Sequence, residues 1–382
     1  MSGNHRSAAI APREALERMR RGRLAIIDVR KRHEQLTGMA SGSRSSAGRS
    51  LAETLDEVLA DHTGIDSIAL ICERGNRSAR ACAAFDERCR VPLLSVQGGM
   101  QAWAAQDLPV TLPPSELSLS ERQRYLRHLA LADIGEAGQL RLKRARVLVV
   151  GAGGLGSPCA MYLAAAGIGQ LDIVDADTVE LSNLQRQLLH AERQVGDPKA
   201  DSARARLAGI NSDIEIRAHR CRLQRDNVED LLEPCSLVID GSDNFPTRYL
   251  INDACIRLGR TMVYGAVERF TGQLGVFRPG DGVQPCYRCL FPRPPAPGDA
   301  PDCAEAGVLG VLPGVIGTLQ AVEALKLVLG IGTELTGSLL HYDALSSAFR
   351  HTRVARDPAC RWCDPAWPIE RYPDYEKFCA VT

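Results

Sequence analysis

Cysteine is the residue type whose spacing most directly indicates chemistry in this chain, which has 382 residues and 13 cysteines. Four of them form two Cys-x-x-Cys pairs, Cys286 with Cys289 and Cys360 with Cys363. Two such pairs offer the four thiolates of a tetrahedral structural zinc site, which leaves no coordination position open for a substrate. A redox-active pair is the alternative. The sequence therefore predicts a Zn2+ ion that clamps the end of the chain onto an earlier segment.

A second kind of thiol chemistry is predicted for Cys72. It ends the apolar run Ser67–Cys72 and precedes a helical pattern, so its thiol faces backbone N–H groups and a helix N-terminus. Such surroundings stabilise a thiolate or a persulfide, and Arg74 and Arg77 add positive charge. The alternative is a half-buried cysteine at the end of a strand.

A glycine-rich turn predicts a nucleotide site. The strand pattern Arg146–Val150 is followed by four glycines before a helical pattern that runs through Ala166: Gly151, Gly153, Gly154 and Gly156. Glycines let the backbone approach a phosphate, which the helix N-terminus also attracts. Asp175 ends the next strand, where its carboxylate would accept hydrogen bonds from ribose hydroxyls. These features do not distinguish NAD from ATP.

The polar residues beyond this turn favour ATP. Arg186 and Lys199 are cations, and Asp243 and Asn244 follow the predicted strand Leu237–Asp240. Strand carboxyl ends are where open α/β sheets bind ligands. Two cations, amides and carboxylates near a glycine turn suit a triphosphate and Mg2+ better than a hydride carrier. An NAD-dependent oxidoreductase remains the alternative that the glycine turn alone would allow.

Strand and helix patterns alternate along the chain, which favours parallel sheets in two α/β units. In the first unit we expect strands at Leu24–Asp28 and Ser67–Cys72, helices at Leu51–Ala60 and Ser78–Arg88, and a loop over Gly38–Ser50. Thr111–Ser115 contains paired prolines and reads as a linker.

In the second unit, Glu116–Leu142 is predicted to be helical, with Ser118 or Ser120 as the N-cap. Val315–Leu329 is predicted as an apolar helix, and residues 292–301, with five prolines, as an irregular loop. Residues 355–382 read as a cysteine-containing tail. Further strands are expected at Leu171–Asp175, Ile214–Ala218, Met262–Tyr264, Gln273–Arg278, Leu339–Asp343 and Ala348–Val354.

The larger unit resembles the ThiF/MoeB family, the bacterial relatives of ubiquitin-activating enzymes. The resemblance covers residues 117–365 and rests on RYLRH (124–128), GAGGLG (151–156), DADTVELSNLQRQLLH (175–190), VGDPKA (195–200), GSDNF (241–245), CYRC (286–289) and CAEAGVLGVLPGVIGTLQAVEALK (303–326). Such enzymes use ATP and Mg2+ to adenylate the C-terminal glycine of a small β-grasp sulfur-carrier protein ending in Gly-Gly, which becomes a thiocarboxylate.

Residue roles follow from this resemblance. It implies that Gly154 and its neighbours contact the nucleotide, that Asp175 binds the ribose, and that Asp243, beside Asn244, holds Mg2+. Arg127 would reach the phosphates of the neighbouring subunit in a homodimer. Asn183, Arg186 and Lys199 would hold the phosphates, and Ser182, Leu184 and Gln185 of the same segment would also contact the nucleotide. Cys303 matches a cysteine on the family's crossover loop, where it would take part in sulfur transfer; an incidental cysteine is the alternative.

The first unit resembles rhodanese-like sulfurtransferases over residues 8–110. The resemblance rests on the loop Cys72–Ser78, on Asp28–Arg30 and on Gly98–Trp103. It implies a persulfide at Cys72, loaded by a cysteine desulfurase or thiosulfate and delivered to the acyl-adenylate. The run after Asp28–Arg30 departs from the family pattern, so a module that only docks a partner is the alternative.

The expected organisation is therefore a rhodanese-like domain (1–110), a linker (111–117), a Rossmann-like adenylyltransferase domain with a zinc site (118–365) and a C-terminal tail (366–382). With 46 basic and 46 acidic side chains the formal charge is zero, which argues against nucleic-acid binding by bulk electrostatics. No unbroken apolar stretch approaches the roughly 20 residues of a membrane span, and the N-terminus lacks a signal-peptide core. We expect a cytoplasmic enzyme. Molybdopterin, thiazole, tRNA-thiolation, cysteine and siderophore carriers all remain open, and LSNLQRQ and CAEAGV favour the molybdopterin type.

Overall fold

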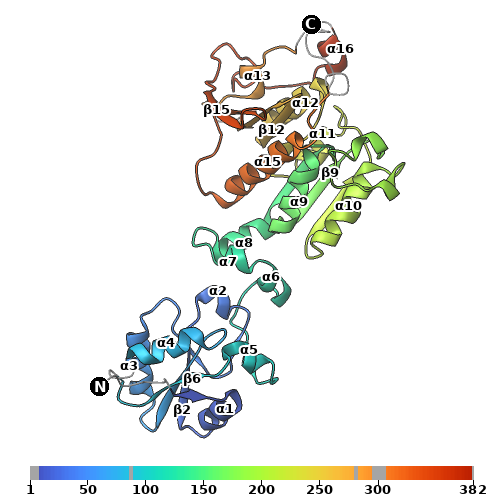
Figure 1. Ribbon diagram of the computed structural model, residues 1–382. Helices are drawn as coiled ribbons and strands as arrows, with labels where there is room; N and C mark the ends of the chain where they lie inside the picture. The colour runs from blue at the N-terminus through green and yellow to red at the C-terminus, as the bar shows by residue number, and fades with distance from the viewer. Residues whose placement is uncertain (1–7, 86–88, 279–282, 295–306, 381–382) are drawn as a thin grey trace. The chain divides into compact units, whose positions relative to one another are not determined.

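The computed structural model describes residues 8–85, 89–278, 283–294 and 307–380. By its internal contacts the chain divides into two compact units, Met1–Glu136 and Ala137–Thr382 (Figure 1). Each unit has its own sheet and its own core, and each is described separately below.

The first unit contains a five-stranded sheet that is parallel throughout. Its order is β1-β6-β5-β2-β4, from Ala9–Ile10, Leu93–Val96, Ser67–Ile71, Leu24–Asp28 and Arg44–Ser45. The strands alternate with helices α1 (Pro12–Arg20), α3 (Leu51–Asp61), α4 (Asn76–Phe85) and α5 (Gly99–Ala104). Strands β2 and β5 are almost wholly buried, which explains why they read as continuous apolar runs.

The segment Gly38–Ser50, predicted as a loop, contains two short strands. Met39–Ala40 (β3) pairs antiparallel with Val110–Thr111 (β7), and β4 pairs with the end of β2. Strands of two residues are too short to produce an alternating pattern, so they could not be predicted from the sequence. The sheet thus continues beyond β2 despite the irregular sequence there.

The predicted helix over Glu116–Leu142 is broken into three pieces, α6 (Leu119–Arg124), α7 (Leu126–Leu129) and α8 (Gly135–Arg144). The N-cap at Ser118 is confirmed, because its hydroxyl accepts a hydrogen bond from the backbone N–H of Glu121. Helix α7 contacts α2 (Arg32–Gln35), so α6 and α7 belong to the first unit.

The second unit is built on an eight-stranded mixed sheet. Its order is β10-β9-β8-β11-β12-β13-β14-β15, from Glu215–His219, Gln170–Val174, Arg146–Val150, Leu237–Asp240, Thr261–Glu268, Thr271–Phe277, Ser338–Asp343 and Ala348–Arg353. Pairing is parallel up to β12 and antiparallel beyond it. Strand β8 lies between β9 and β11, so the chain reverses direction across the sheet there. The carboxyl ends of β8 and β11 therefore flank a topological switch point, where open α/β sheets bind ligands.

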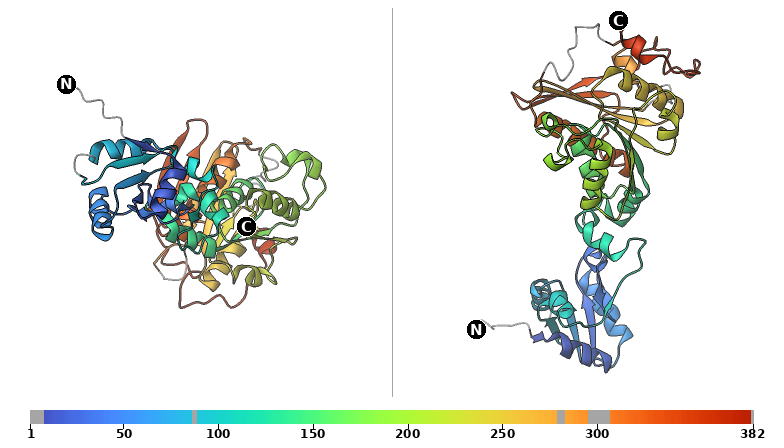
Figure 2. Two further views of the ribbon diagram at one scale, coloured as in Figure 1. Left: turned by 90° about the horizontal axis from the view of Figure 1, so that it is seen from below. Right: turned by 90° about the vertical axis from the view of Figure 1, so that its right-hand side faces the viewer.

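Helices lie on both faces of this sheet (Figure 2). Helix α9 (Gly156–Ala166) packs against both α10 (Lys199–Ile210) and α15 (Leu312–Leu329). Helix α12 (Phe245–Leu258) packs with α11 (Val228–Leu232), α13 (Tyr287–Leu290) and α16 (Tyr375–Ala380). Two short 3-10 turns, Leu181–Asn183 and Glu192–Gln194, precede α10.

Within the described part of the chain, α15 is the one helix with the length and apolar character of a membrane span. It nevertheless packs against α9, β12 and β13, and half of it is buried. Its composition is thus accounted for by its place in the core of the second unit.

Candidate functional sites

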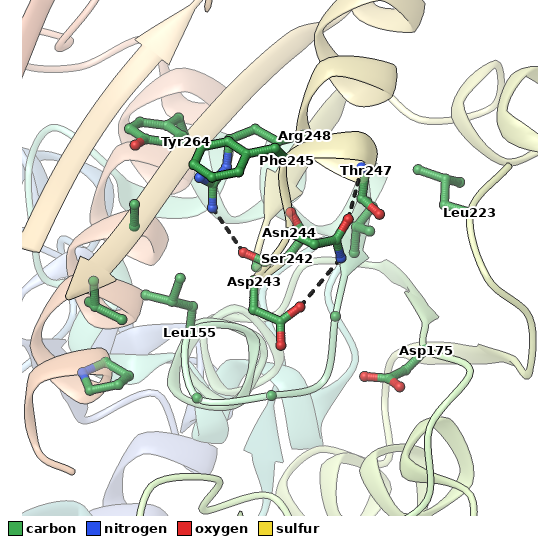
Figure 3. Close-up of a pocket in the computed structure, with 18 of the residues that line it drawn as sticks. Leu155, Asp175, Leu223, Ser242, Asp243, Asn244, Phe245, Thr247, Arg248 and Tyr264 are labelled. Carbon is green, nitrogen blue, oxygen red and sulfur yellow. Dashed lines mark hydrogen bonds between the residues drawn. The ribbon is translucent and has the colours of Figure 1, made fainter. Parts of the chain in front are cut away.

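A cavity of about 710 Å³ opens at the carboxyl ends of β8 and β11 in the second unit. The glycine turn, the end of β9, the start of α10 and the loop after β11 all line it. Figure 3 shows Asp175 and Asp243 facing this cavity from two of these segments. Residues far apart in the sequence thus converge at the switch point.

Gly151, after β8, and Gly156, at the start of α9, are required by close backbone contact. Gly151 has φ +91°, and a Cβ placed on it would lie 2.7 Å from the carbonyl oxygen of Gly241. A Cβ on Gly156 would lie 1.8 Å from the carbonyl oxygen of Gly151. Side chains at these positions would push the turn away from the start of α9. The N-terminus of α9 therefore remains open to a phosphate.

Asp175 fixes the glycine turn while lining the cavity. Its carboxylate accepts hydrogen bonds from the backbone N–H groups of Ala152 and Asp177, both at 2.8 Å. Burial raises the pKa of Asp175, and these two hydrogen bonds oppose that rise. A carboxylate held at this point is placed to accept further hydrogen bonds from the hydroxyls of a ribose.

Two cations line the same cavity. Lys199, the first residue of α10, is only 7% exposed and pairs with Asp177, whose Oδ2 lies 3.1 Å from Nζ. Arg186 donates a hydrogen bond to the carbonyl oxygen of Ser182 at 3.2 Å. An entering polyanion would meet both charges together with the α9 N-terminus.

The loop after β11 presents an exposed carboxylate, Asp243, to the cavity. Its neighbour Asn244 caps α12, because its Oδ1 accepts a hydrogen bond from the N–H of Thr247 at 3.0 Å. The Asn244 amide also donates to Asp243 Oδ1 at 3.4 Å (Figure 3). An exposed carboxylate beside a phosphate-binding turn is the type of ligand that Mg2+ prefers.

Arg248 supports this loop and was not among the predicted site residues. It donates hydrogen bonds to Asp240 Oδ2 and to the carbonyl oxygen of Ser242, both at 3.0 Å. Burial opposes its charge, yet the neighbouring Asp240 carboxylate raises the pKa of Arg248 above its usual range. Its position one turn into the helix after GSDNF is the signal that would have found it.

Some predicted nucleotide contacts lie beside the cavity rather than on its wall. Gly156 begins α9, and Ser182 and Asn183 form the 3-10 turn before Arg186. Neither these residues nor Leu184 and Gln185 line the cavity, whereas Gln187 does. This segment therefore contributes Arg186 and Gln187 to the wall.

The two Cys-x-x-Cys pairs come together into one cluster. All four Sγ atoms lie within 4.8 Å of one another, with Cys286 at 3.8 Å from both Cys289 and Cys360, and Cys289 at 3.5 Å from Cys363. A Zn–S bond of about 2.3 Å in a tetrahedral site corresponds to an S···S separation of about 3.8 Å. The donor set and its spacing thus fit a tetrahedral metal ion.

Buried contacts hold this cluster in place. Arg288 forms a two-point ion pair with Asp253, with both N···O distances at 2.8 Å, and its guanidinium lies 3.9 Å from the ring of Trp362. Tyr375 of the tail donates a hydrogen bond to the same Asp253 carboxylate at 2.7 Å. The segment with the second cysteine pair is therefore anchored by more than the thiols.

In the first unit, Cys72 lies at the carboxyl end of β5 at the start of the turn into α4. Its sulfur accepts hydrogen bonds from the Gly75 N–H at 3.1 Å and from the Ser78 N–H and hydroxyl, both at 3.4 Å. Burial opposes ionisation, but hydrogen bonds from the Ser78 hydroxyl and from the backbone of Ser78, Arg74 and Arg77 outweigh it and lower the pKa of the Cys72 thiol. The sequence expectation of a stabilised thiolate agrees with this geometry.

The nearby arginines do not all face the sulfur. Arg77 pairs with Glu34 of α2, with Nη1 2.8 Å from Oε2. Arg74 is exposed on the loop.

Arg127, on α7, is also exposed and belongs to the first unit. Cys303 lies outside the described residues.

Comparison with known proteins places these two units in known families. The model of the ThiF family matches residues 125–362, and that of the rhodanese-like domain matches residues 11–106. A sulfur carrier protein adenylyltransferase of Thermus thermophilus is 51% identical over 68% of this chain and 97% of its own length. The mouse adenylyltransferase and sulfurtransferase MOCS3 is 49% identical over 72% of this chain, which covers 59% of that protein.

The fold of the second unit also has a counterpart among solved structures. A crystal structure of E. coli MccB with ATP superposes with a TM-score of 0.53 at 20% identity, covering 69% of this chain and 85% of MccB. At this level of identity the likeness concerns the fold.

Proposed function

Because this chain belongs to the ThiF family and contains a rhodanese-like domain, we propose that it adenylates the C-terminal glycine of a small sulfur-carrier protein and then transfers sulfur to it. The observation that carries the proposal is the convergence of Asp175, Arg186, Lys199 and Asp243 on one cavity at the glycine turn. The names of the two relatives support adenylyl transfer over hydride transfer to NAD.

In the proposed first step, the carrier carboxylate attacks the α-phosphorus of ATP and pyrophosphate leaves. The nucleophile is already anionic, so the protein needs alignment and charge neutralisation rather than a general base. Asp175 would bind the ribose, and Arg186 and Lys199 would hold the phosphates. Asp243 would hold Mg2+, which neutralises charge on the phosphate oxygens when bound.

In the proposed second step, the terminal sulfur of a Cys72 persulfide attacks the acyl carbon and AMP leaves. The product is an acyl disulfide between the carrier and Cys72. A second thiolate then attacks the Cys72 sulfur, which releases the carrier thiocarboxylate and leaves a disulfide at Cys72. Cys303 is our candidate for that thiol. The lowered pKa of the Cys72 thiol, caused by hydrogen bonds from Ser78 and the backbone, supports this chemistry over a module that only docks a partner.

The remaining parts of the proposal concern metal, assembly and partner. The thiol cluster would hold a structural Zn2+ ion, since four sulfurs leave no open position. The enzyme would act in the cytoplasm as a homodimer in which Arg127 serves the neighbouring active site. A cysteine desulfurase or thiosulfate would supply sulfur. The motifs LSNLQRQ and CAEAGV favour a carrier of the molybdopterin-synthase type.

Carrier-dependent ATP–pyrophosphate exchange tests the proposal directly. The full-length protein is incubated with Mg2+, ATP, labelled pyrophosphate and, one at a time, small β-grasp proteins ending in Gly-Gly. We expect exchange with one carrier and none with a carrier that lacks its final glycine. Absence of exchange with every carrier, despite ATP binding, would contradict adenylation.

The variant Asp243→Ala tests the assignment of the cavity. We expect exchange to fall by at least about a hundredfold, the usual scale for losing one group that stabilises developing charge. Sulfur loading of Cys72 should be unchanged, because it occurs in the first unit. Asp226→Ala is the matched control, since Asp226 is an exposed carboxylate of the same unit outside the cavity. Full exchange in Asp243→Ala would refute the assignment.

A further inference from the structure

Arg122 of α6 hydrogen-bonds to backbone atoms of other segments of the first unit. It is only 6% exposed although it is an arginine on a short surface helix, α6. Its guanidinium donates hydrogen bonds to three backbone carbonyls: Leu117 at 2.9 Å, Pro113 at 2.9 Å and Leu36 at 3.0 Å. The last of these lies 86 positions earlier in the chain, at the end of α2.

Helix α2 lies between the Cys72 loop and α7. On one side Glu34 pairs with Arg77 at the start of α4, and Arg30 donates to the Glu34 carbonyl at 3.3 Å. On the other side α2 packs against α7. Burial lowers the pKa of His33 on α2; Glu34 opposes this, and the positive charges of Lys31, Arg77 and Arg127 lower it further. Arg77 of α4 and helix α7 thus both contact the same short helix.

We propose that Arg122 is a positioning residue that anchors α6 and α7, and with them Arg127, on the unit that contains Cys72. The proposal rests on the proposed function, in which Arg127 acts on the phosphates of a neighbouring subunit. Loss of Arg122 would leave three carbonyls, including that of Leu36, without their charged donor, which is costly where they are buried. Helix α7 would then lose its fixed place against α2, and Arg127 its alignment.

This arrangement makes the rate of adenylation depend on the rhodanese-like unit. A group that aligns the transition state affects turnover more than ground-state binding, and small displacements of such a group are costly. Loss of the hydrogen bond from Arg122 of α6 to the carbonyl of Leu36 should therefore lower kcat and leave the KM for ATP nearly unchanged. The persulfide chemistry of Cys72 would be preserved in the same protein.

The test is a double-mutant cycle in the full-length protein, read by carrier-dependent pyrophosphate exchange. Arg122→Gln should lower kcat by about tenfold to a hundredfold, with the KM for ATP changed less than about twofold. Arg122→Lys, which keeps the charge and part of the bonding, should lose less. In an Arg127→Ala background neither substitution should cause a further loss, because the group being positioned is gone.

Arg44→Gln is the matched control, because Arg44 is an arginine of the same unit whose ion pairs go to Glu57 and Asp61 of α3 and not to α2. It should keep full exchange. An equal further loss from Arg122→Gln in the Arg127→Ala background would overturn the proposal, as would an unchanged kcat in Arg122→Gln. If Arg122→Gln unfolds, as judged by its thermal transition, the same cycle with Arg122→Lys decides. Full exchange in Arg127→Ala would instead identify failure of the proposed role of Arg127, with adenylation itself intact.

Discussion

Replacing Ser78 by alanine should raise the pKa of Cys72. The hydroxyl of Ser78 is one of three donors to the sulfur, at 3.4 Å, and the other two are the backbone N–H groups of Gly75 and Ser78. Burial raises the pKa of this thiol, so its lowered value depends on those donors. Removing one of these donors should therefore leave the effect of burial less opposed and raise the pKa of the thiol.

The size of the shift follows from the strength of one such hydrogen bond. A hydrogen bond to a charged group contributes about 1.5–3 kcal/mol, and a long bond to sulfur belongs at the bottom of that range. About 1.4 kcal/mol corresponds to about one pKa unit. At a pH below both pKa values, the thiolate fraction of Ser78→Ala should therefore be about one tenth of that in the parent.

The assay is the rate of Cys72 alkylation by iodoacetamide as a function of pH, followed by mass spectrometry of the peptide that contains it. The rate rises with pH as the thiol ionises, so the profile of Ser78→Ala should move to higher pH. Its plateau should be no lower than that of the parent, because a thiolate of higher pKa is the stronger nucleophile.

Ser95→Ala provides the control, because the Ser95 hydroxyl lies 2.8 Å from that of Ser78 and is not a donor to the sulfur. We expect its profile to shift by less than about 0.3 pKa units, because no bond to the thiolate is lost. A profile of Ser78→Ala that coincides with the parent, or moves to lower pH, would refute the reasoning.

Three further outcomes are expected. Cys360→Ser should lower both the zinc content and the melting temperature, whereas Cys255→Ser, a buried cysteine outside the cluster, should keep its zinc; equal zinc in both variants would contradict a metal site. Subunits carrying Arg127→Ala and Asp243→Ala, each inactive alone, should recover exchange when combined in one dimer, and no recovery would place Arg127 in its own subunit's site. Because burial raises the pKa of Asp175, ATP binding should weaken as the pH falls through that raised value, and Asp175→Asn should lose this part of the pH dependence measured by titration.

The central strands and the glycine turn could be predicted because their signals are local. The strand pattern of Arg146–Val150 and the glycines after it follow from burial on both faces and from backbone contact. The division of the predicted helix over Glu116–Leu142 was less accessible. Gly135, with φ +53°, begins α8 there, and a pattern of apolar residues does not reveal such a reorientation.

Contacts with backbone atoms were beyond sequence reasoning. Arg122 donates hydrogen bonds to three backbone carbonyls. Every residue has a backbone carbonyl, so the residue types give no sign of which carbonyls an arginine will bind. Arg248 lines the cavity while its bonds go to Asp240 and to a backbone oxygen, so only its position one turn after GSDNF could have indicated it. The family resemblance, in turn, predicted the segment from Ser182 to Arg186 as a whole, whereas its geometry brings only the last of these residues to the cavity wall.

The thiol cluster joins segments that leave the ribosome at different times. The sulfurs of Cys286 and Cys360 lie 3.8 Å apart although 74 positions separate them in the chain. At synthesis rates of roughly 5–20 residues per second, the first pair waits several seconds for the second. During that interval two thiols stand in an unfinished site, open to oxidation or to a wrong ligand. Closure of the cluster thus requires synthesis through Cys363, and a chain that terminates before this residue keeps an open cysteine pair.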